Sequence, residues 1–310
     1  MAKDVFVNLH LHTESSLQDS VITIPKLYRQ VKQYEQSAVA ITDHGSCANW
    51  VEFSNYFGKK GNIKPIFGNE FYCTNQGIFA EDKKRRDHLV LLAMNAEGLV
   101  NIRRLQRFAV YDYYYKPLLY YDKVLNKNDT NGIYALSACS LSSISKSILD
   151  GDMQKATSYC EYFNDLFNGN FSLELQFHPD YKEQRLINEK IVDLSDRLDI
   201  PLVVTCDAHF CNIDEDRELR KIMQAACWGK MFDDETLYDT LKSNCIGNSE
   251  LIKQFAQESG FEYPHIVNQA IQQTSKVASL CNAQLEQPQR RIPLFDKHYE
   301  FDDLFEEVIW

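Results

Sequence analysis

Seven short apolar runs recur along the chain, and this recurrence limits the fold more than any other feature. Stretches with helical periodicity lie between them, such as residues 24–36 and 183–199. Strands that alternate with helices predict a parallel sheet, and seven units rich in Val, Ile and Leu favour a closed or nearly closed (β/α) barrel. An open doubly wound sheet is the alternative, although the chain has no GxGxxG turn to support a dinucleotide-binding version. The runs cover residues 5–11, 38–42, 65–71, 89–94, 133–137, 172–177 and 201–205.

The pattern changes from about residue 214. Residues 214–230, 248–260 and 263–285 have helical patterns, and Asn248 or Ser249 is a plausible N-cap for the second of them. The last part of the chain is punctuated by proline and then acidic. We therefore expect a barrel domain with C-terminal helices over residues 1–280, and a linker-like tail over residues 281–310.

Composition restricts the class of protein. Hydrophobic residues make up 44% of the 310, and the nine cysteines include no CxxC pair, which predicts a sizeable core with mostly buried thiols in a reducing compartment. The chain has no long apolar segment and no signal-peptide pattern, so we expect a cytoplasmic protein without a membrane partner. The net charge of -11 disfavours a general electrostatic grip on duplex DNA, so any contact with nucleic acid must be local.

Histidines and carboxylates gather where the predicted strands end. His10 and His12 are two residues apart and share one face of their strand, while residues 5, 7, 9 and 11 are Val, Val, Leu and Leu. His88 differs because it precedes its apolar run. The other runs end in Asp43 and His44, Glu70, Cys139, His178, and Asp207 and His209.

Such a set of side chains predicts a metal site at the mouth of the barrel. A lone histidine or cysteine would be an ordinary core or surface residue, but ligand-type residues at the ends of several strands are difficult to explain in that way. Nitrogen and oxygen donors with at most one thiolate suit zinc, manganese or iron. The candidates exceed the needs of one ion, so we expect two or three divalent ions, an arrangement that suits phosphoester hydrolysis.

These residues stand in motifs that resemble the PHP (polymerase and histidinol phosphatase) family, in the form that opens the alpha subunits of bacterial or phage DNA polymerase III. The motifs follow in order as "HLHTESSLQDS", "AITDHG", "NIKPIFGNEFY", "HLVLLAMN", "YYYKPLL", "ALSAC", "LELQFH", "EQRLIN" and "IPLVVTCDAHF". The resemblance implies a distorted (β/α)7 barrel with the metal site at the C-terminal ends of the strands. It also implies nine metal ligands, namely His10, His12, Asp19, His44, Glu70, His88, Cys139, Asp207 and His209.

The resemblance further implies a metal-dependent 3'→5' exonuclease that proofreads DNA together with a polymerase subunit or the rest of a polymerase chain. His10, His12, Asp19 and Asp207 are expected to serve catalysis, and Asp43 to orient a histidine. Two alternatives stay open. One is a small-molecule phosphatase of the histidinol-phosphate type, and the other is a non-catalytic module that metals stabilise.

Contacts with a single-stranded or frayed 3' end are expected from residues near the ligands. A basic stretch precedes His88, and an aromatic stretch with a lysine follows later; stacking and phosphate contacts would use such groups. A solvated loop and ordinary aromatic packing are the corresponding alternatives. The candidates are Arg85, Arg86, Tyr114, Tyr115, Lys116 and His178.

Overall fold

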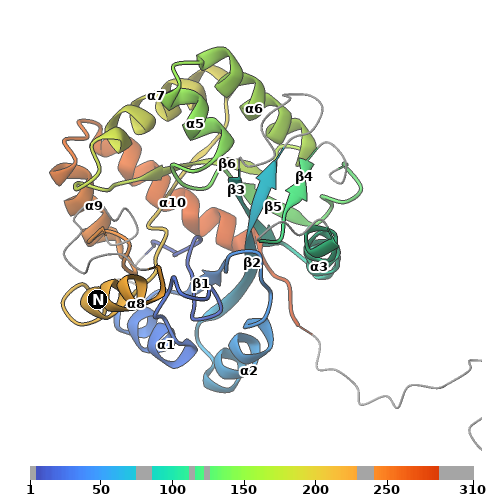
Figure 1. Ribbon diagram of the computed structural model, residues 1–310, viewed down its shortest axis with the longest axis vertical. Helices are drawn as coiled ribbons and strands as arrows, with labels where there is room; N and C mark the ends of the chain where they lie inside the picture. Colours follow the sequence, from blue (N-terminus) through green and yellow to red (C-terminus); the bar gives the residue numbers. More distant parts are fainter. Residues whose placement is uncertain (1–4, 75–85, 112–115, 122–125, 229–240, 286–310) are drawn as a thin grey trace, which may run out of the picture.

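The computed structural model describes residues 5–74, 86–111, 116–121, 126–228 and 241–285. A curled sheet lies at its centre, with helices around it (Figure 1). The strands are β1 (Ala38–Ile41), β2 (Lys64–Thr74), β3 (Asp87–Ala93), β4 (Leu119–Tyr120), β5 (Ile133–Leu136), β6 (Phe171–Gln176) and β7 (Leu202–Thr205). The helices are α1 (Ile24–Gln33), α2 (Trp50–Lys60), α3 (Ala96–Tyr111), α5 (Ser143–Leu149), α6 (Met153–Leu166), α7 (Glu183–Leu198), α8 (Asp216–Trp228), α9 (Ser249–Glu258) and α10 (Pro264–Leu280).

The sheet follows the order β1-β2-β3-β5-β6-β7, and β4 pairs with β2. The pairs β1/β2, β2/β4, β5/β6 and β6/β7 are parallel, as the alternating pattern predicts. Strand β3 is antiparallel to both β2 and β5. Its first residues therefore lie at the same edge as the last residues of its neighbours, and His88 pairs with Tyr72 near the end of β2. This reversal explains why His88 precedes its apolar run.

The first apolar run is not a regular strand, contrary to the sequence prediction. Residues 5–11 instead span the gap between the two edges of the sheet. The amides of Ala40 and Thr42 donate to the carbonyls of Asn8 and Leu11, at 2.8 and 2.7 Å, and the segment bridges to Ala208 on the other side. Between these two bonds the segment advances three positions, from 8 to 11, while its partner advances two, from 40 to 42, and one extra residue is typical of a β-bulge.

The bulge also divides the expected apolar face. Val7 and Leu9 join one buried cluster, Leu11 joins another, and Val5 is half exposed. An extra residue shifts the alternation of side chains by one position, so that Leu9 and His10 can both lie on the inner side. His10 and His12 still lie together, with their ring centroids 5.4 Å apart.

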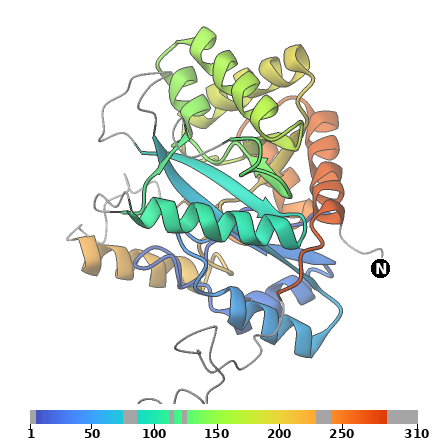
Figure 2. The same ribbon diagram turned by 90° about the vertical axis from the view of Figure 1, so that its right-hand side faces the viewer.

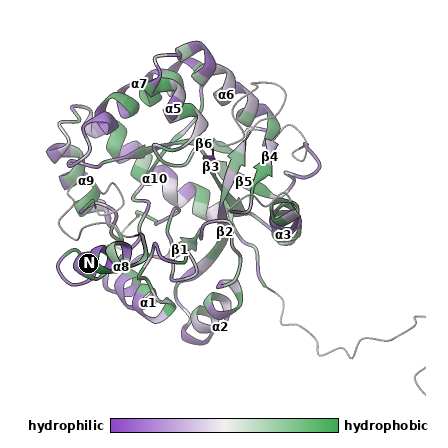
Figure 3. Ribbon diagram, viewed as in Figure 1, coloured by the Kyte–Doolittle hydropathy of each residue, from purple (hydrophilic) through white to green (hydrophobic). Residues whose placement is uncertain are grey.

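Two apolar clusters hold the sheet. The larger one joins alternate strand residues, such as Val39 and Leu91, to the helices around the sheet. The smaller one joins the opposite face, including Ala40 and Val90, to the C-terminal end of α10, which crosses the middle of the molecule in Figure 1. In the side view α3 lies across the outer face (Figure 2), and the hydrophobic colours concentrate on the strands and on the inward sides of the helices (Figure 3).

The helices expected from the sequence are confirmed. Helix α1 carries its apolar residues on one side, and α9 begins after Asn248, whose side chain accepts a 2.8 Å hydrogen bond from the amide of Leu251. Among the described residues, no helix has the length and apolar character needed to cross a membrane. Helix α10 ends at Leu280, and residues 286–310 of the expected tail lie outside the described residues.

Candidate metal centre

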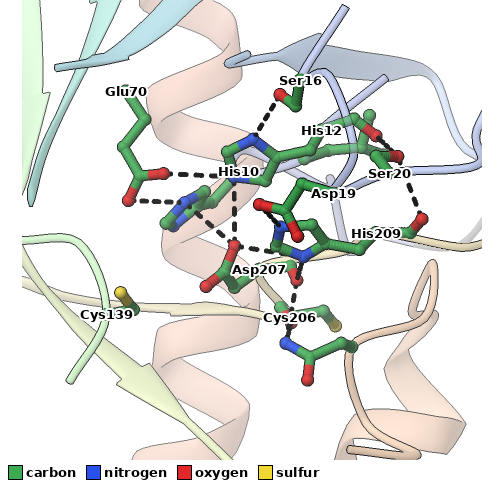
Figure 4. A network of polar contacts seen from close by, with 12 residues as sticks. His10, His12, Ser16, Asp19, Ser20, Glu70, Cys139, Cys206, Asp207 and His209 are labelled. Carbon is green, nitrogen blue, oxygen red and sulfur yellow. Dashed lines mark hydrogen bonds and ion pairs between the residues drawn. The ribbon is translucent and has the colours of Figure 1, made fainter. Parts of the chain in front are cut away.

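Asp207, which follows β7, lies between the two histidines of the first motif (Figure 4). Its Oδ1 is 3.3 Å from His10 Nε2 and 3.1 Å from His12 Nε2. Glu70 of β2 meets the same two nitrogens, with Oε1 3.3 Å from His10 and Oε2 3.2 Å from His12. All four side chains are buried. Two imidazoles and two carboxylates thus converge on one small space, close enough to share an ion.

Glu70 also connects to a second group. Its Oε2 lies 2.8 Å from His44 Nδ1 and its Oε1 2.9 Å from His88 Nδ1. The thiol of Cys139 lies 3.5 Å from the same nitrogen of His88. The loop after β1, strand β3 and the loop after β5 therefore bring His44, His88 and Cys139 together beside Glu70.

Asp19 belongs to a third group. Its Oδ2 lies 3.0 Å from His44 Nε2 and 3.4 Å from His209 Nε2. The ring of His12 stacks on that of His209 with centroids 4.3 Å apart, which places the third group beside the first. Seven of the nine positions that the sequence predicts as ligands thus form overlapping groups close enough to share ions, and Asp19 and Cys139 contact these groups at His44, His209 and His88.

The hydrogen bonds of three histidines decide which ring nitrogen faces this cluster. His10 Nδ1 is 3.0 Å from the Glu174 carboxylate, and His209 Nδ1 is 2.7 Å from the backbone carbonyl of Asp207. Both partners only accept, so both Nδ1 atoms carry the proton. The Ser16 hydroxyl donates its proton to Asp43 Oδ1 at 3.0 Å. His12 Nδ1 lies 3.0 Å from Ser16 Oγ and must therefore donate to this oxygen. In the neutral form of each ring, Nε2 is therefore the nitrogen that carries the lone pair toward the cluster.

Apart from the ion-pair contacts given above, these facing atoms have no hydrogen-bond partner among the described residues. They are Nε2 of His10, His12 and His209, Nδ1 of His44, both carboxylate oxygens of Glu70, and Oδ1 of Asp207. Buried polar atoms in this number are costly unless something binds them. Divalent metal ions fit the donor set, because imidazole nitrogens and carboxylate oxygens suit zinc, manganese and iron.

The electrostatics of the cluster are strongly perturbed. Burial lowers the pKa of His10, but the surrounding carboxylates, with Asp207 first among them, raise it well above its usual value. Burial also lowers the pKa of His44, but the carboxylates of Glu70 and Asp19 outweigh burial and raise it to about 10. Burial would raise the pKa of Asp207, yet the neighbouring imidazoles hold it well below the usual range. Without metal, the imidazoles thus compensate the carboxylates by holding protons.

Strained backbone accompanies three of the candidate ligands. Asp207 has φ of 47°, Ala138 before Cys139 has 63°, and Gln18 before Asp19 has 65°. Non-glycine residues rarely adopt this left-handed region, and such strain persists where the surrounding structure imposes it. At these three positions the contacts of the cluster, and not the local backbone preference, therefore determine the conformation.

Three residues outside the candidate ligands support them, and only one of the three was expected from the sequence. Asp43 reaches His12 through Ser16, in agreement with the orienting role expected for it. Glu174 was missed, although "SLELQF" places Ser172, Glu174 and Gln176 on one face of a buried strand, which is a recognisable signal. Arg220, which donates to Asp19, was also missed, because an arginine in a charged helix looks like a solvated residue.

The expected substrate contacts have different outcomes. Arg85, Tyr114 and Tyr115 lie outside the described residues, and Arg86 is half-buried with its carbonyl accepting a hydrogen bond from Lys146. Lys116 is exposed, with Nζ 2.6 Å from the hydroxyl of Tyr72.

Tyr72 in turn stacks on His44, with ring centroids 5.3 Å apart, so Lys116 places a cation at the edge of the cluster. His178 is only 1% exposed, and its two ring nitrogens face Ser243 and Gln176. Burial lowers its pKa to about 4, so its ring is neutral at pH 7 and unsuited to hold a phosphate.

Comparison with known proteins agrees with this geometry. The family model described as "PHP domain" matches residues 8–178. A DNA polymerase III subunit alpha from Aquifex aeolicus is 34% identical over 73% of this chain and 20% of its own length. The same subunit from Treponema pallidum is 29% identical over 97% of this chain and 25% of its own length. The chain thus spans a fifth to a quarter of these relatives.

A solved two-domain protein from Bacteroides vulgatus, described as containing a predicted PHP-like metal-dependent phosphoesterase, aligns over 82% of this chain and 69% of its own. Its sequence identity is 11% and the TM-score 0.43. The match of the family model over more than half of the chain, together with the polymerase relatives, establishes that this chain belongs to the PHP domain family.

Proposed function

We propose that this chain is a metal-dependent phosphoesterase that acts as a 3'→5' exodeoxyribonuclease and proofreads in association with a replicative DNA polymerase. One observation carries the chemical part of the proposal: His10, His12 and His209 each hold Nδ1 in a hydrogen bond and turn Nε2 toward buried carboxylates of the cluster. Histidines held in this way are typical of metal ligands. The similarity to polymerase alpha subunits supports the biological part.

The candidate ligands fall into three overlapping groups, which supports a site for two or three ions. His10, His12, Glu70 and Asp207 would hold one ion. Each of His12, Glu70 and His44 belongs to two of the three groups, so neighbouring ions would have ligands in common. Divalent ions bound there would supply Lewis acidity, an activated water and charge stabilisation for the leaving oxygen. In the reaction, water adds to phosphorus, the bond to the 3' oxygen of the preceding nucleotide breaks, and a nucleoside 5'-monophosphate leaves.

The residues around the site support a single-stranded end as the substrate. Lys116 is exposed beside Tyr72, near the His44 and His88 part of the cluster. One local cation can orient a phosphate, whereas a net charge of -11 disfavours a general electrostatic grip on duplex DNA. We therefore expect faster digestion of single-stranded or mismatched 3' ends than of paired ends.

The test combines metal analysis with hydrolysis by the same purified protein. Zinc, manganese and iron are measured by mass spectrometry, and 3'-labelled single-stranded, mismatched and paired DNA are compared with a phosphate monoester. Asp207→Asn serves as the site variant and Asp165→Asn as its matched control, because the Asp165 side chain is 75% exposed. The expected result is bound metal and metal-dependent release of mononucleotides that only the site variant loses.

Other outcomes would decide between the remaining functions. Release of phosphate from monoesters without shortening of DNA would replace the proposal with a small-molecule phosphatase. Bound metal with no hydrolysis of either substrate would assign the site to stabilisation of a larger assembly. Equal rates on paired and frayed ends would refute the proofreading role but not the nuclease activity.

A further inference from the structure

Helix α8 buries a polar face. Asp216, Arg220 and Gln224 recur every four residues, and their exposed fractions are 6%, 0% and 0%. The outward side instead carries Leu219 and Ile222, which are 48% and 53% exposed. An amphipathic helix normally buries its apolar side, so the inward polar residues must have partners that compensate their burial.

Arg220 contacts Asp19 twice. Its Nε donates to the backbone carbonyl of Asp19 at 2.6 Å, and Nη2 donates to the carboxylate Oδ1 at 2.6 Å. Gln224, one turn further along, reaches the same Oδ1 at 3.4 Å. The guanidinium is planar and holds its donors in a fixed fork, so two contacts fix both the position and the direction of the aspartate.

This arrangement divides the Asp19 carboxylate between two tasks. Oδ1 faces Arg220, and Oδ2 remains for His44 and His209, at 3.0 and 3.4 Å. Asp19 sits in a loop, after Gln18 with its φ of 65°, so regular secondary structure does not set its orientation. The contact from α8, 201 residues along the chain, sets it instead.

We propose that Arg220 is a positioning residue that holds Asp19 as a ligand and thereby determines occupancy of the metal position formed with His44 and His209. The inference rests on the metal site of the proposed function. It adds that α8, from outside the ring of strands, controls one metal position. The position formed by His10, His12, Glu70 and Asp207 does not depend on this contact.

Arg220→Met tests the inference, since methionine keeps an unbranched apolar stem and removes the donors. Lys221→Met is the control on the same helix, because Lys221 contacts only Glu218 among the ion pairs of the described residues. Wild type and variants are loaded with Zn²⁺, dialysed and analysed for metal content, and each step of Co²⁺ binding is followed by absorption spectroscopy. We expect Arg220→Met to lose one ion, or to bind it about 10–100-fold more weakly, while the remaining ions and their spectra are unchanged.

Further variants separate positioning from general stability. Asp19→Asn should lose the same ion, and the double variant should lose no more, because both changes act on one ligand. Guanidinium added to Arg220→Ala should restore part of the binding, which a purely structural role would not predict. If Arg220→Met does not fold, the same measurements on Arg220→Lys decide the question, since lysine keeps the charge but lacks the fork.

The results also separate this inference from the proposed function. Wild-type protein that binds no metal would overturn both. Wild type and Arg220→Met with equal metal content and affinity would overturn only the role of Arg220, even if the variant melted at a lower temperature.

Discussion

Glu174 offers the most direct test of how buried hydrogen bonds orient the candidate ligand histidines. Its carboxylate accepts hydrogen bonds from His10 Nδ1 at 3.0 Å, from the amide of Ala138 at 2.6 Å and from the hydroxyl of Thr205. Both oxygens therefore face donors, and the side chain is 1% exposed. Glu174→Gln keeps the shape but leaves only one accepting oxygen, so one donor must face an amide NH₂.

The size of the effect follows from that mismatch. A hydrogen bond to a charged group contributes about 1.5–3 kcal/mol, and a similar loss of unfolding free energy is expected in the metal-free protein. If the NH₂ faces His10, the proton of that ring moves from Nδ1 to Nε2, and Nε2 can no longer bind an ion. Loss of such a carboxylate partner typically weakens metal binding by about 10–100-fold.

Two measurements keep these effects apart. Metal affinity is measured by competition with a chromophoric chelator, and unfolding free energy by denaturant titration in excess chelator. Glu161→Gln is the matched control, because Glu161 is exposed on α6. A variant that lost stability but kept the metal affinity of wild type within about twofold would refute the argument from the His10 tautomer, since the expected change is at least about tenfold.

Three further predictions follow from the same structure. Asp207→Asn should reduce hydrolysis at least about tenfold, a barrier increase of about 1.4 kcal/mol, with the circular dichroism spectrum of wild type; a smaller loss would place Asp207 outside the site. Free Zn²⁺ at about 100 times its dissociation constant at pH 7 should stabilise the fold by about 2.7 kcal/mol, and the gain at that fixed Zn²⁺ concentration should increase with pH. The sign follows from His44, whose pKa is about 10 in the folded protein against a usual value of 6.5. Its protonation stabilises the metal-free protein fully below about pH 6.5 and loses this contribution toward about pH 10, whereas metal ions bind only the neutral ring. Melting temperatures with Zn²⁺ and with chelator between pH 6 and 9 measure the gain, and parallel curves would refute the prediction. A thiol reagent should modify Cys227 quickly and the other cysteines slowly, since Cys227 is exposed and the rest are buried or half-buried; a fast reaction that survives Cys227→Ser would contradict this.

Most of the candidate ligand positions could be predicted because they follow from the ends of apolar runs, whereas Asp19 was expected only from the family resemblance. A polar residue that follows an apolar strand lies at the edge of the sheet, so Asp207 could be predicted from the run before it. Glu70 was predicted in the same way, although β2 continues beyond it to Thr74. His88 did not fit this reasoning, because its strand runs in the opposite direction. Direction depends on pairing with β2 and β5, which a single run of apolar residues does not encode.

The supporting contacts depend on the assembled fold and could not be predicted in the same way. The extra residue in the segment before His10 becomes a bulge only when β1 and Ala208 flank it. Arg220 becomes a partner of Asp19 only when α8 turns its polar face inward. His178 has the sequence context of a site residue, yet Ser243 and Gln176 occupy both of its ring nitrogens.

The buried cluster also contributes negative charge to the net charge of the chain. Glu70, Glu174 and Asp207 place negative charge in the interior, where unpaired carboxylates are very unfavourable. Protons on His10 and His44 compensate this charge without metal, and each bound divalent ion would add two positive charges at the same place. Bound ions are the largest local charges in such a site and determine its potential. In the proposed function, bound ions would offset this buried negative charge where a phosphodiester binds, while the net charge of -11 disfavours a general grip on duplex DNA.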